Sequence, residues 1–165
     1  MEKGRFTVEV RPSPLTSSGM DAVEFLFSAD GGEPPRPLNK TASGGELSRV
    51  MLAIKETLAE VDGIPVLIFD EVDAGIGGKT AEHVGMRLKN LSRRHQVICI
   101  THLPQIAAMA DHHVVIEKLQ KKTGVCVRVR EAVSKEREEE IARMLSGTIT
   151  EISLRHAREL IGRTA

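Results

Sequence analysis

Tryptophan and tyrosine are absent from this 165-residue sequence, and only four phenylalanines are present. Surfaces that bind single-stranded nucleic acid usually stack bases on aromatic rings, so this scarcity argues against such a surface. An excess of positive charge is also lacking, because Lys and Arg together number 23 and Asp and Glu together number 23. A domain that held DNA by electrostatics alone would be basic. The basic residues Arg93, Arg94, Lys118, Lys121 and Lys122 are therefore interpreted as parts of solvated faces.

Cysteine is scarce as well, and Cys99 and Cys126 both lie in apolar, β-branched runs. They are expected to be small core residues in a reducing compartment rather than a disulfide or a metal pair. Long apolar runs are missing, and the N-terminal sequence MEKGRF has no signal-peptide core. These absences predict a cytoplasmic protein with no membrane partner.

The first part of the sequence has the pattern of a β-hairpin. Residues 5–10 and 22–29 resemble strands and flank a turn rich in Pro, Ser and Gly. Residues 30–37 are rich in Gly and Pro, which predicts an extended loop.

From residue 43 onward, strand-like runs alternate with amphipathic helical patterns, which predicts a single α/β domain over residues 1–165. The runs 64–69 and 96–100 are apolar enough for parallel strands covered on both faces. Ser134 and Thr150 are expected to open helices, and Gly147 to end one. The other predicted strands are residues 112–118 and 124–131, and the predicted helices are residues 43–61, a segment carrying Ala81 to Leu91, and residues 103–110, 134–145 and 150–161.

The stretch LIFDEVDAGIGGKT, residues 67–80, looks like a phosphate-binding loop because it ends in Gly-Lys-Thr. Such a loop has the form G-x-x-x-x-G-K-[ST], and its first glycine would stand where the sequence has Asp73. Carboxylates in this stretch would repel a triphosphate. The glycines are therefore expected to form a tight turn, and Lys79 and Thr80 to open the next helix.

The acids that follow the apolar run are better candidates for chemistry. An apolar strand that ends in Asp-Glu is typical of nucleotide hydrolysis from the metal side. Asp70 would hold Mg²⁺ directly or through its water, and Glu71 would orient and deprotonate an attacking water. The alternative is an ordinary acidic turn after a core strand.

Two other segments carry possible phosphate contacts. In TASGGELSRV, Ser43 and Glu46 form a capping-box pattern, and Gly44 and Gly45 leave room for an anion at the helix start. In VICITH, His102 follows the second apolar strand, at the sheet edge where ligands of α/β proteins bind. The alternatives are an ordinary helix cap and a structural histidine.

Taken in order, SGGE, LIFDE and ITH resemble the signature motif, the Walker B strand and the switch histidine of an ABC-type ATPase head, in the family of the SMC and double-strand-break-repair ATPases. The resemblance implies the C-terminal lobe of a P-loop (ABC-type) ATPase head, with a largely parallel sheet flanked by helices and an N-terminal β-hairpin. Residues 1–38 would be the hairpin and its Pro-rich loop, and residues 39–165 the lobe itself.

The resemblance also implies roles for individual residues. Asp70 would be the Walker B metal ligand, Glu71 the catalytic base and His102 the switch histidine. The D-loop differs, because Gly77 stands where many ABC proteins have Asp, so that contact is absent or is made by the backbone. The signature, which binds ATP held by the opposite head, would be Ser43, Gly44, Gly45 and Glu46.

The 165 residues contain neither a Walker A motif nor a long coiled coil. The implied partners are an N-terminal head lobe and coiled coil of the same protein, a second head in a homodimer, and DNA through the intact protein. The implied cofactors are ATP and Mg²⁺, and the implied location is cytoplasmic and nucleoid-associated. This segment alone is expected to be inactive, and its sheet to expose an edge and an apolar face.

Two other functions remain open at the level of sequence. The segment could be a non-catalytic dimerisation or interaction module whose acids and histidine are structural. It could also be a Mg²⁺-dependent phosphotransferase or nuclease that uses Asp70, Glu71 and Asp73, although such an enzyme would give no reason for the SGGE helix start.

Overall fold

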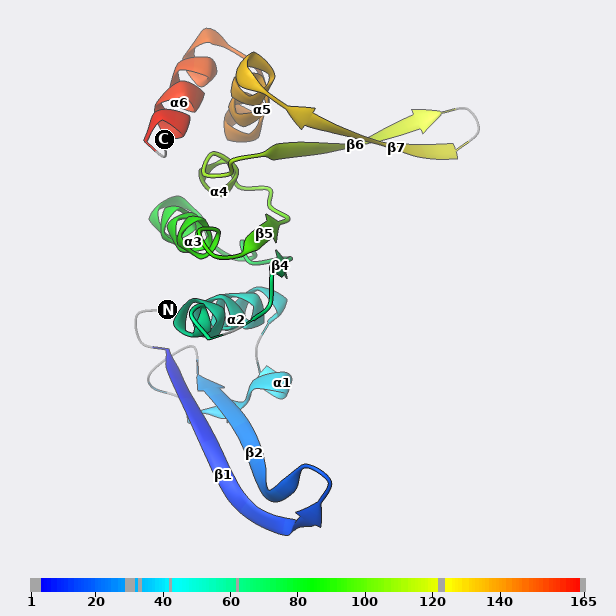
Figure 1. Cartoon of the computed structure of the whole chain (residues 1–165). Coiled ribbons are helices and arrows are strands. Elements are labelled where there is room, and N and C mark those ends of the chain that lie inside the picture. The colour runs from blue at the N-terminus through cyan, green and yellow to red at the C-terminus, as the bar shows by residue number, and fades with distance from the viewer. Residues whose placement is uncertain are drawn as a thin grey trace. The chain divides into compact units, whose positions relative to one another are not determined.

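A computed structural model describes residues 4–28, 32, 34–41, 43–61, 63–121 and 124–163. The chain forms two compact units, Met1–Leu47 and Ser48–Ala165, which are described separately (Figure 1). The prediction of one domain with an internal division after residue 38 stays a prediction. Parts of the predicted loop 30–37, together with Lys122 and the side chain of Lys121, lie outside the described residues.

The first unit contains the predicted β-hairpin. Strands β1 (Arg5–Thr16) and β2 (Gly19–Ser28) pair antiparallel, β3 (Arg36–Pro37) adds to β2, and the short helix α1 (Leu38–Thr41) follows. The broad turn expected between residues 10 and 22 is wrong, because β1 continues through its prolines to Thr16. Both prolines lie on an edge strand of the described sheet, where a missing N–H is tolerated, and the register is irregular between Pro12 and Thr16.

One face of this hairpin is apolar and exposed. Residues that pair across the two strands point to the same face. The rings of Phe6 and Phe25 stack there with their centroids 5.7 Å apart. The other large exposed apolar residues on this face are Val8, Val10 and Val23.

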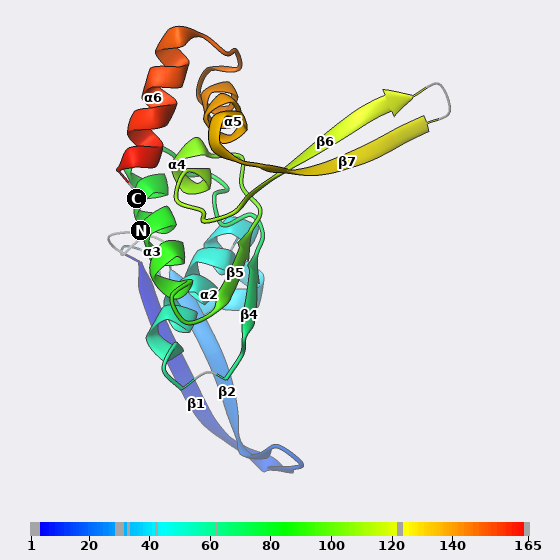
Figure 2. The ribbon, with the colours of Figure 1, turned by 45° about the horizontal axis from the view of Figure 1, so that its top comes forward.

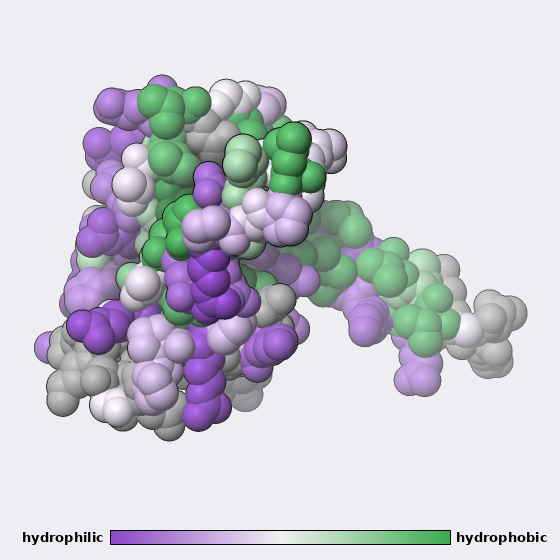
Figure 3. All heavy atoms as spheres, turned by 90° about the horizontal axis from the view of Figure 1, so that it is seen from below, coloured by the Kyte–Doolittle hydropathy of each residue, from purple (hydrophilic) through white to green (hydrophobic). Residues whose placement is uncertain are grey.

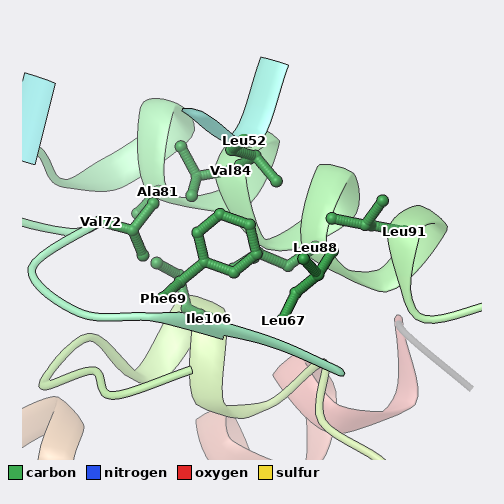
Figure 4. Close-up of a cluster of buried hydrophobic side chains, with 9 residues drawn as sticks. All are labelled: Leu52, Leu67, Phe69, Val72, Ala81, Val84, Leu88, Leu91 and Ile106. Atoms are coloured by element: carbon green, nitrogen blue, oxygen red, sulfur yellow. The ribbon is translucent and has the colours of Figure 1, made fainter. Parts of the chain in front are cut away.

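The second unit is built on a parallel strand pair. Strands β4 (Val66–Phe69) and β5 (Gln96–Cys99) pair in register, and helix α3 (Gly78–Leu91) connects them. Helix α2 (Gly44–Leu58) begins in the first unit and continues into the second, and α4 (Pro104–Ala107) follows β5. In Figure 4 the ring of Phe69 lies in the middle of the main core. This core consists of Leu52, Leu67, Phe69, Val72, Ala81, Val84, Leu88, Leu91 and Ile106.

Only one face of the parallel pair is covered. Leu67 and Phe69 are 7% and 5% exposed, whereas Val66 is 41% and Ile68 is 67% exposed. Ile98, which pairs with Ile68, is also exposed. The expectation that these strands are covered on both faces is therefore wrong for this chain, and the expected exposed apolar face is confirmed.

The remaining strands form a second hairpin, β6 (His113–Lys121) and β7 (Gly124–Ala132), which extends as an arm in Figure 2. Because only two residues connect them, these strands must pair antiparallel. The parallel portion is therefore smaller than expected, since β4 and β5 are the one parallel pair among the described strands.

Figure 3 shows hydrophobic side chains along the β6–β7 arm. The exposed ones on one face are Val114, Ile116, Val125, Val127 and Val129.

Helices α5 (Ser134–Ser146) and α6 (Glu151–Gly162) complete the chain (Figure 2). Gly147 ends α5 in the left-handed conformation with φ 76°, and Thr150 caps α6 through a capping box with Ser153, so both predictions are confirmed. Helix α5 begins at Ser134, as predicted, although Val133 is its N-cap and no side-chain cap bond forms. None of the helices in the described parts of the chain has the length and apolar character needed to cross a bilayer.

The two cysteines are free thiols and are both half-buried. Cys99 packs against the main core, as predicted. Cys126 lies on β7 opposite Leu119 in the hairpin, rather than in either core cluster.

Candidate functional site

The two parallel strands end at the same edge of the sheet. The Ile100 N–H donates to the Phe69 carbonyl oxygen at 2.9 Å, which continues the ladder one residue beyond β5. The turn that begins with Asp70 and the segment that contains His102 therefore emerge side by side. This edge, at the carboxyl ends of parallel strands, is where ligands of α/β proteins bind.

Asp70 and Glu71 form an exposed turn directly after β4. The Glu71 N–H donates to Asp70 Oδ1 at 2.9 Å, and the Ala74 N–H donates to the Glu71 carbonyl oxygen at 2.9 Å. Glu71 has a φ of 56°, in the left-handed region that few residues other than glycine adopt. The turn therefore leaves both acidic side chains at the solvent-facing edge of the sheet.

Helix α2 holds this turn in place through two polar side chains. Ser48 Oγ donates to the Asp70 carbonyl oxygen at 2.7 Å. Arg49 Nη1 donates to the carbonyl oxygens of Val72 and Ala74 at 3.2 and 2.8 Å. The sequence interpretation missed both residues. Their signal is that they lie four and three positions before Leu52, on the side of the helix that faces the core.

Asp73 connects the two segments at this edge. Its side chain is only 5% exposed, and Oδ2 accepts hydrogen bonds from Thr101 Oγ1 at 2.6 Å and from the His102 N–H at 2.8 Å. His102 Nδ1 lies 2.9 Å from the same oxygen, while the ring is 73% exposed. In the sequence, Asp73 was only a possible metal ligand, because nothing local indicates a partner 28 or 29 residues away.

The pKa of the Asp73 carboxyl reflects a balance of opposing effects. Burial by itself raises this pKa, but hydrogen bonds from Thr101 and from the His102 backbone outweigh burial and hold it below its ordinary value. Burial, together with the negative charges of Asp73 and Asp70, raises the pKa of the Cys99 thiol to about 12. Asp73 is therefore an ionised acceptor near neutral pH, and Cys99 is a protonated thiol.

This balance predicts a pH dependence of stability. Because the pKa of Asp73 is lowered in the folded state, its stabilising contribution is complete above about pH 4, the ordinary aspartate value, and is lost as pH falls through the folded-state pKa. Urea unfolding of the chain and of Asp73→Asn should give a difference in unfolding free energy that shrinks below that pH. Asp21→Asn, at an exposed position, is the control and should leave the unfolding free energy nearly unchanged. A difference for Asp73→Asn that stays constant through the acid range would contradict this assignment.

The signature-like segment lies in the first unit. The Ser43 N–H donates to Glu46 Oε2 at 3.0 Å, and the Glu46 N–H donates to Ser43 Oγ at 3.3 Å, so the predicted capping box is confirmed. Gly44 and Gly45 are the first two residues of α2. The two units are described separately, so the structure brings together Asp70, Glu71 and His102 of the second unit, and the role of the signature stays a prediction.

The Gly-Lys-Thr sequence has the structure expected of a turn and helix start. Gly75 and Gly78 have φ values of 70° and 53°, and α3 begins at Gly78, so that Lys79 and Thr80 lie in its first turn. The interpretation of these residues as a tight turn and helix start is confirmed.

Among the described residues, no group of three or more His, Cys, Asp or Glu side chains is arranged to hold a metal ion. Mg²⁺ is usually held by one or two carboxylates together with substrate phosphates and waters. Asp70 is an exposed carboxylate that could act in this way, and its metal role stays a prediction.

No protein-family model matches the sequence. Curated relatives do match it. The DNA repair protein RecN of Halalkalibacterium halodurans is 44% identical over 167 residues, which cover 98% of this chain and 30% of that protein. RecN of Treponema pallidum is 54% identical and covers 87% of this chain, and RecN of Bacillus subtilis is 46% identical and covers 93%. The chain corresponds to the C-terminal part of RecN. It spans only 25% to 30% of the length of these RecN proteins.

Solved structures support the fold. An Smc head domain with a coiled coil and joint from Pyrococcus yayanosii matches with a TM-score of 0.60 and 22% identity, over 87% of this chain and 26% of that one. A structure from work on ATP-driven dimerization and DNA-stimulated activation of SMC ATPases matches with a TM-score of 0.50 and 21% identity, over 87% and 84% of the two chains. The predicted fold class, the C-terminal lobe of an ABC-type ATPase head, is confirmed.

Proposed function

We propose that this RecN segment supplies part of the ATP-hydrolysis site of a protein that acts in DNA double-strand-break repair and recombination. One observation carries the proposal. Asp70 and Glu71 follow β4, His102 follows the adjacent parallel strand β5, and Asp73 joins the two segments through hydrogen bonds. Two acids and an imidazole at one sheet edge form a set suited to phosphoryl chemistry. The names of the RecN relatives support the assignment to DNA repair.

Each of the three side chains has a separate task in this proposal. Asp70 would hold Mg²⁺, which neutralises charge on the phosphates when it is bound. Glu71 would orient a water molecule and accept its proton. His102 would donate a hydrogen bond to the terminal phosphate of ATP. The exposed carboxylates and the exposed imidazole ring leave room for the nucleotide on this edge.

The signature segment would act on a second ATP. A helix start with free N–H groups attracts anions, and Gly44 and Gly45 allow a phosphate to approach closely. We assign Ser43, Gly44, Gly45 and Glu46 to ATP held by the second head of a homodimer. The matching structure from work on ATP-driven dimerization of SMC ATPases supports this arrangement by analogy. Gly77 offers only backbone groups for the contact that an Asp would make there.

The other partners in this proposal are the parts of RecN that lie outside this chain. These parts include the N-terminal lobe of the head, the coiled coil and, through the intact protein, DNA. The exposed apolar faces of the β1–β2 hairpin and of the β4–β5 pair support such partners, because a protein surface rarely leaves such faces uncovered.

The same apolar faces also favour the alternative of a non-catalytic interaction module. The alternative of a nuclease with Asp73 as a metal ligand has less support. Asp73 is buried, and its Oδ2 is already committed to Thr101 and His102. A metal ion there would have to displace these hydrogen bonds.

The test compares this chain with the same chain joined to the remainder of a RecN polypeptide. Because no phosphate loop is present in the 165 residues, the chain alone is expected to bind ATP weakly and to hydrolyse almost none. The joined protein should bind ATP tightly and turn it over. Calorimetric titration with ATP and a phosphate-release assay measure the two properties. Tight ATP binding with turnover by the chain alone would refute the proposal that the main phosphate-binding residues lie outside these 165 residues. A joined protein that binds ATP without hydrolysing it would favour the interaction module.

A further inference from the structure

Asp73 differs from the two acids before it in both burial and contacts. Asp70 and Glu71 are exposed, whereas Asp73 is 4% exposed. Its Oδ2 accepts hydrogen bonds from Thr101 Oγ1 at 2.6 Å and from the His102 N–H at 2.8 Å, and His102 Nδ1 lies 2.9 Å from the same oxygen. Thr101 Oγ1 in turn accepts from the Leu103 N–H at 3.0 Å. The carboxylate therefore organises the whole segment after β5.

The short distance between this carboxylate and His102 Nδ1 favours one position for the proton of the neutral ring. An ionised carboxylate has no hydrogen to donate and only accepts. The lowered pKa of Asp73 keeps it ionised near neutral pH. An ionised oxygen 2.9 Å from Nδ1 repels a lone pair on that nitrogen, which favours hydrogen on Nδ1 and leaves Nε2 for a ligand, on a side chain that is 73% exposed.

We infer that Asp73 is the positioning residue of His102, which it holds in the Nδ1–H form with Nε2 free to meet a phosphate oxygen. Asp73 also follows Glu71 by two residues in the same turn, whose backbone Arg49 fixes on both sides of Asp73. The phosphate as ligand rests on the proposed function, whereas the state of the ring does not.

A second histidine in the chain provides an internal control. His112 Nδ1 lies 2.8 Å from Glu131 Oε1, a contact of nearly the same length. Its side chain is 83% exposed and that of Glu131 is 51% exposed, so water competes for both partners. A solvated pair of this kind contributes little and does not fix a ring.

Nitrogen-15 NMR of the imidazole rings, at a pH at which they are neutral, tests the inference on this chain as it stands. His102 is expected to show a single form with hydrogen on Nδ1, and His112 a mixture of the two forms. Asp73→Ala should convert His102 to such a mixture, whereas Glu131→Gln should leave His102 unchanged. If His102 in the unaltered chain shows a mixture or a bare Nδ1, the inference is overturned. The spectrum of the unaltered chain tests the inference even if the Asp73→Ala variant does not fold.

Assays of ATP hydrolysis by the joined RecN protein distinguish a failure of the positioning role of Asp73 from a failure of the proposed function. Asp73→Ala and His102→Ala should each lower kcat by about 10–100-fold, the effect typical of a lost carboxylate–histidine contact, with little change in KM for ATP. The double variant should be no worse than His102→Ala, because both changes remove one interaction. If His102→Ala lowers kcat and Asp73→Ala does not, the positioning role is overturned. If neither does, the proposed function of His102 fails.

Discussion

Glu71→Gln in the joined RecN protein is expected to lower the rate of ATP hydrolysis by about 10²–10⁴-fold, the range for loss of a general base. Glutamine keeps the size of the side chain and its hydrogen-bonding oxygen but cannot accept a proton from water. ATP binding should persist, because the role proposed for Glu71 is on the attacking water rather than on the phosphates. Single-turnover phosphate release and equilibrium ATP binding measure the two effects separately.

Glu60→Gln provides the matched control for this change. Glu60 is an exposed acid of the same unit that pairs with Arg94 at 3.0 Å on the surface, away from the sheet edge. Its replacement should leave hydrolysis nearly unchanged. If the Glu71→Gln protein hydrolyses ATP at the rate of the unaltered protein, Glu71 is not the base.

Phe69→Ala is expected to have the largest effect on stability and to cost about 3–5 kcal/mol of unfolding free energy. Phe69 is 5% exposed, and its ring lies in the middle of the main core in Figure 4, with Leu52 and Val84 among its neighbours. Alanine would leave a cavity that side chains from α2, α3 and β4 can fill only in part. Urea unfolding of the chain, followed by circular dichroism, measures the loss.

The neighbouring residue on the same strand is the control for this prediction. Ile68 is 67% exposed on the opposite face of β4, so Ile68→Ala removes an apolar side chain, smaller than that of Phe69, without opening a cavity. We expect it to cost less than about 1 kcal/mol. Equal losses for the two variants would mean that both faces of β4 are covered in solution.

Local features were the ones that could be predicted from the sequence. The capping box at Ser43, the helix start at Thr150 and the helix end at Gly147 depend on residues within a few positions of one another. The closeness of Asp70 and His102 could also be predicted, because parallel strands place their carboxyl ends at one sheet edge. The fold class followed from the alternation of strands and helices together with the resemblance to ABC-type heads.

Contacts between distant residues could not be predicted. Ser48 and Arg49 bond to backbone oxygens 22 to 25 residues away, and Asp73 accepts from residues 28 and 29 positions later. An exposed apolar face was expected, but the sequence did not show which face of β4 it would be, because a continuous apolar run has no period that marks one side. The long β1 strand was missed because prolines usually end strands, and an edge position lifts that restriction.

The left-handed backbone of Glu71 places two requirements on one position. This conformation costs a residue with a Cβ atom about 1–2 kcal/mol, whereas it costs glycine almost no free energy. Selection of this chain for thermal endurance alone would therefore favour glycine at position 71, and the gain would come with the loss of the acid. Under the proposed function, stability and ATP turnover place opposite demands on this position, and glutamate favours turnover.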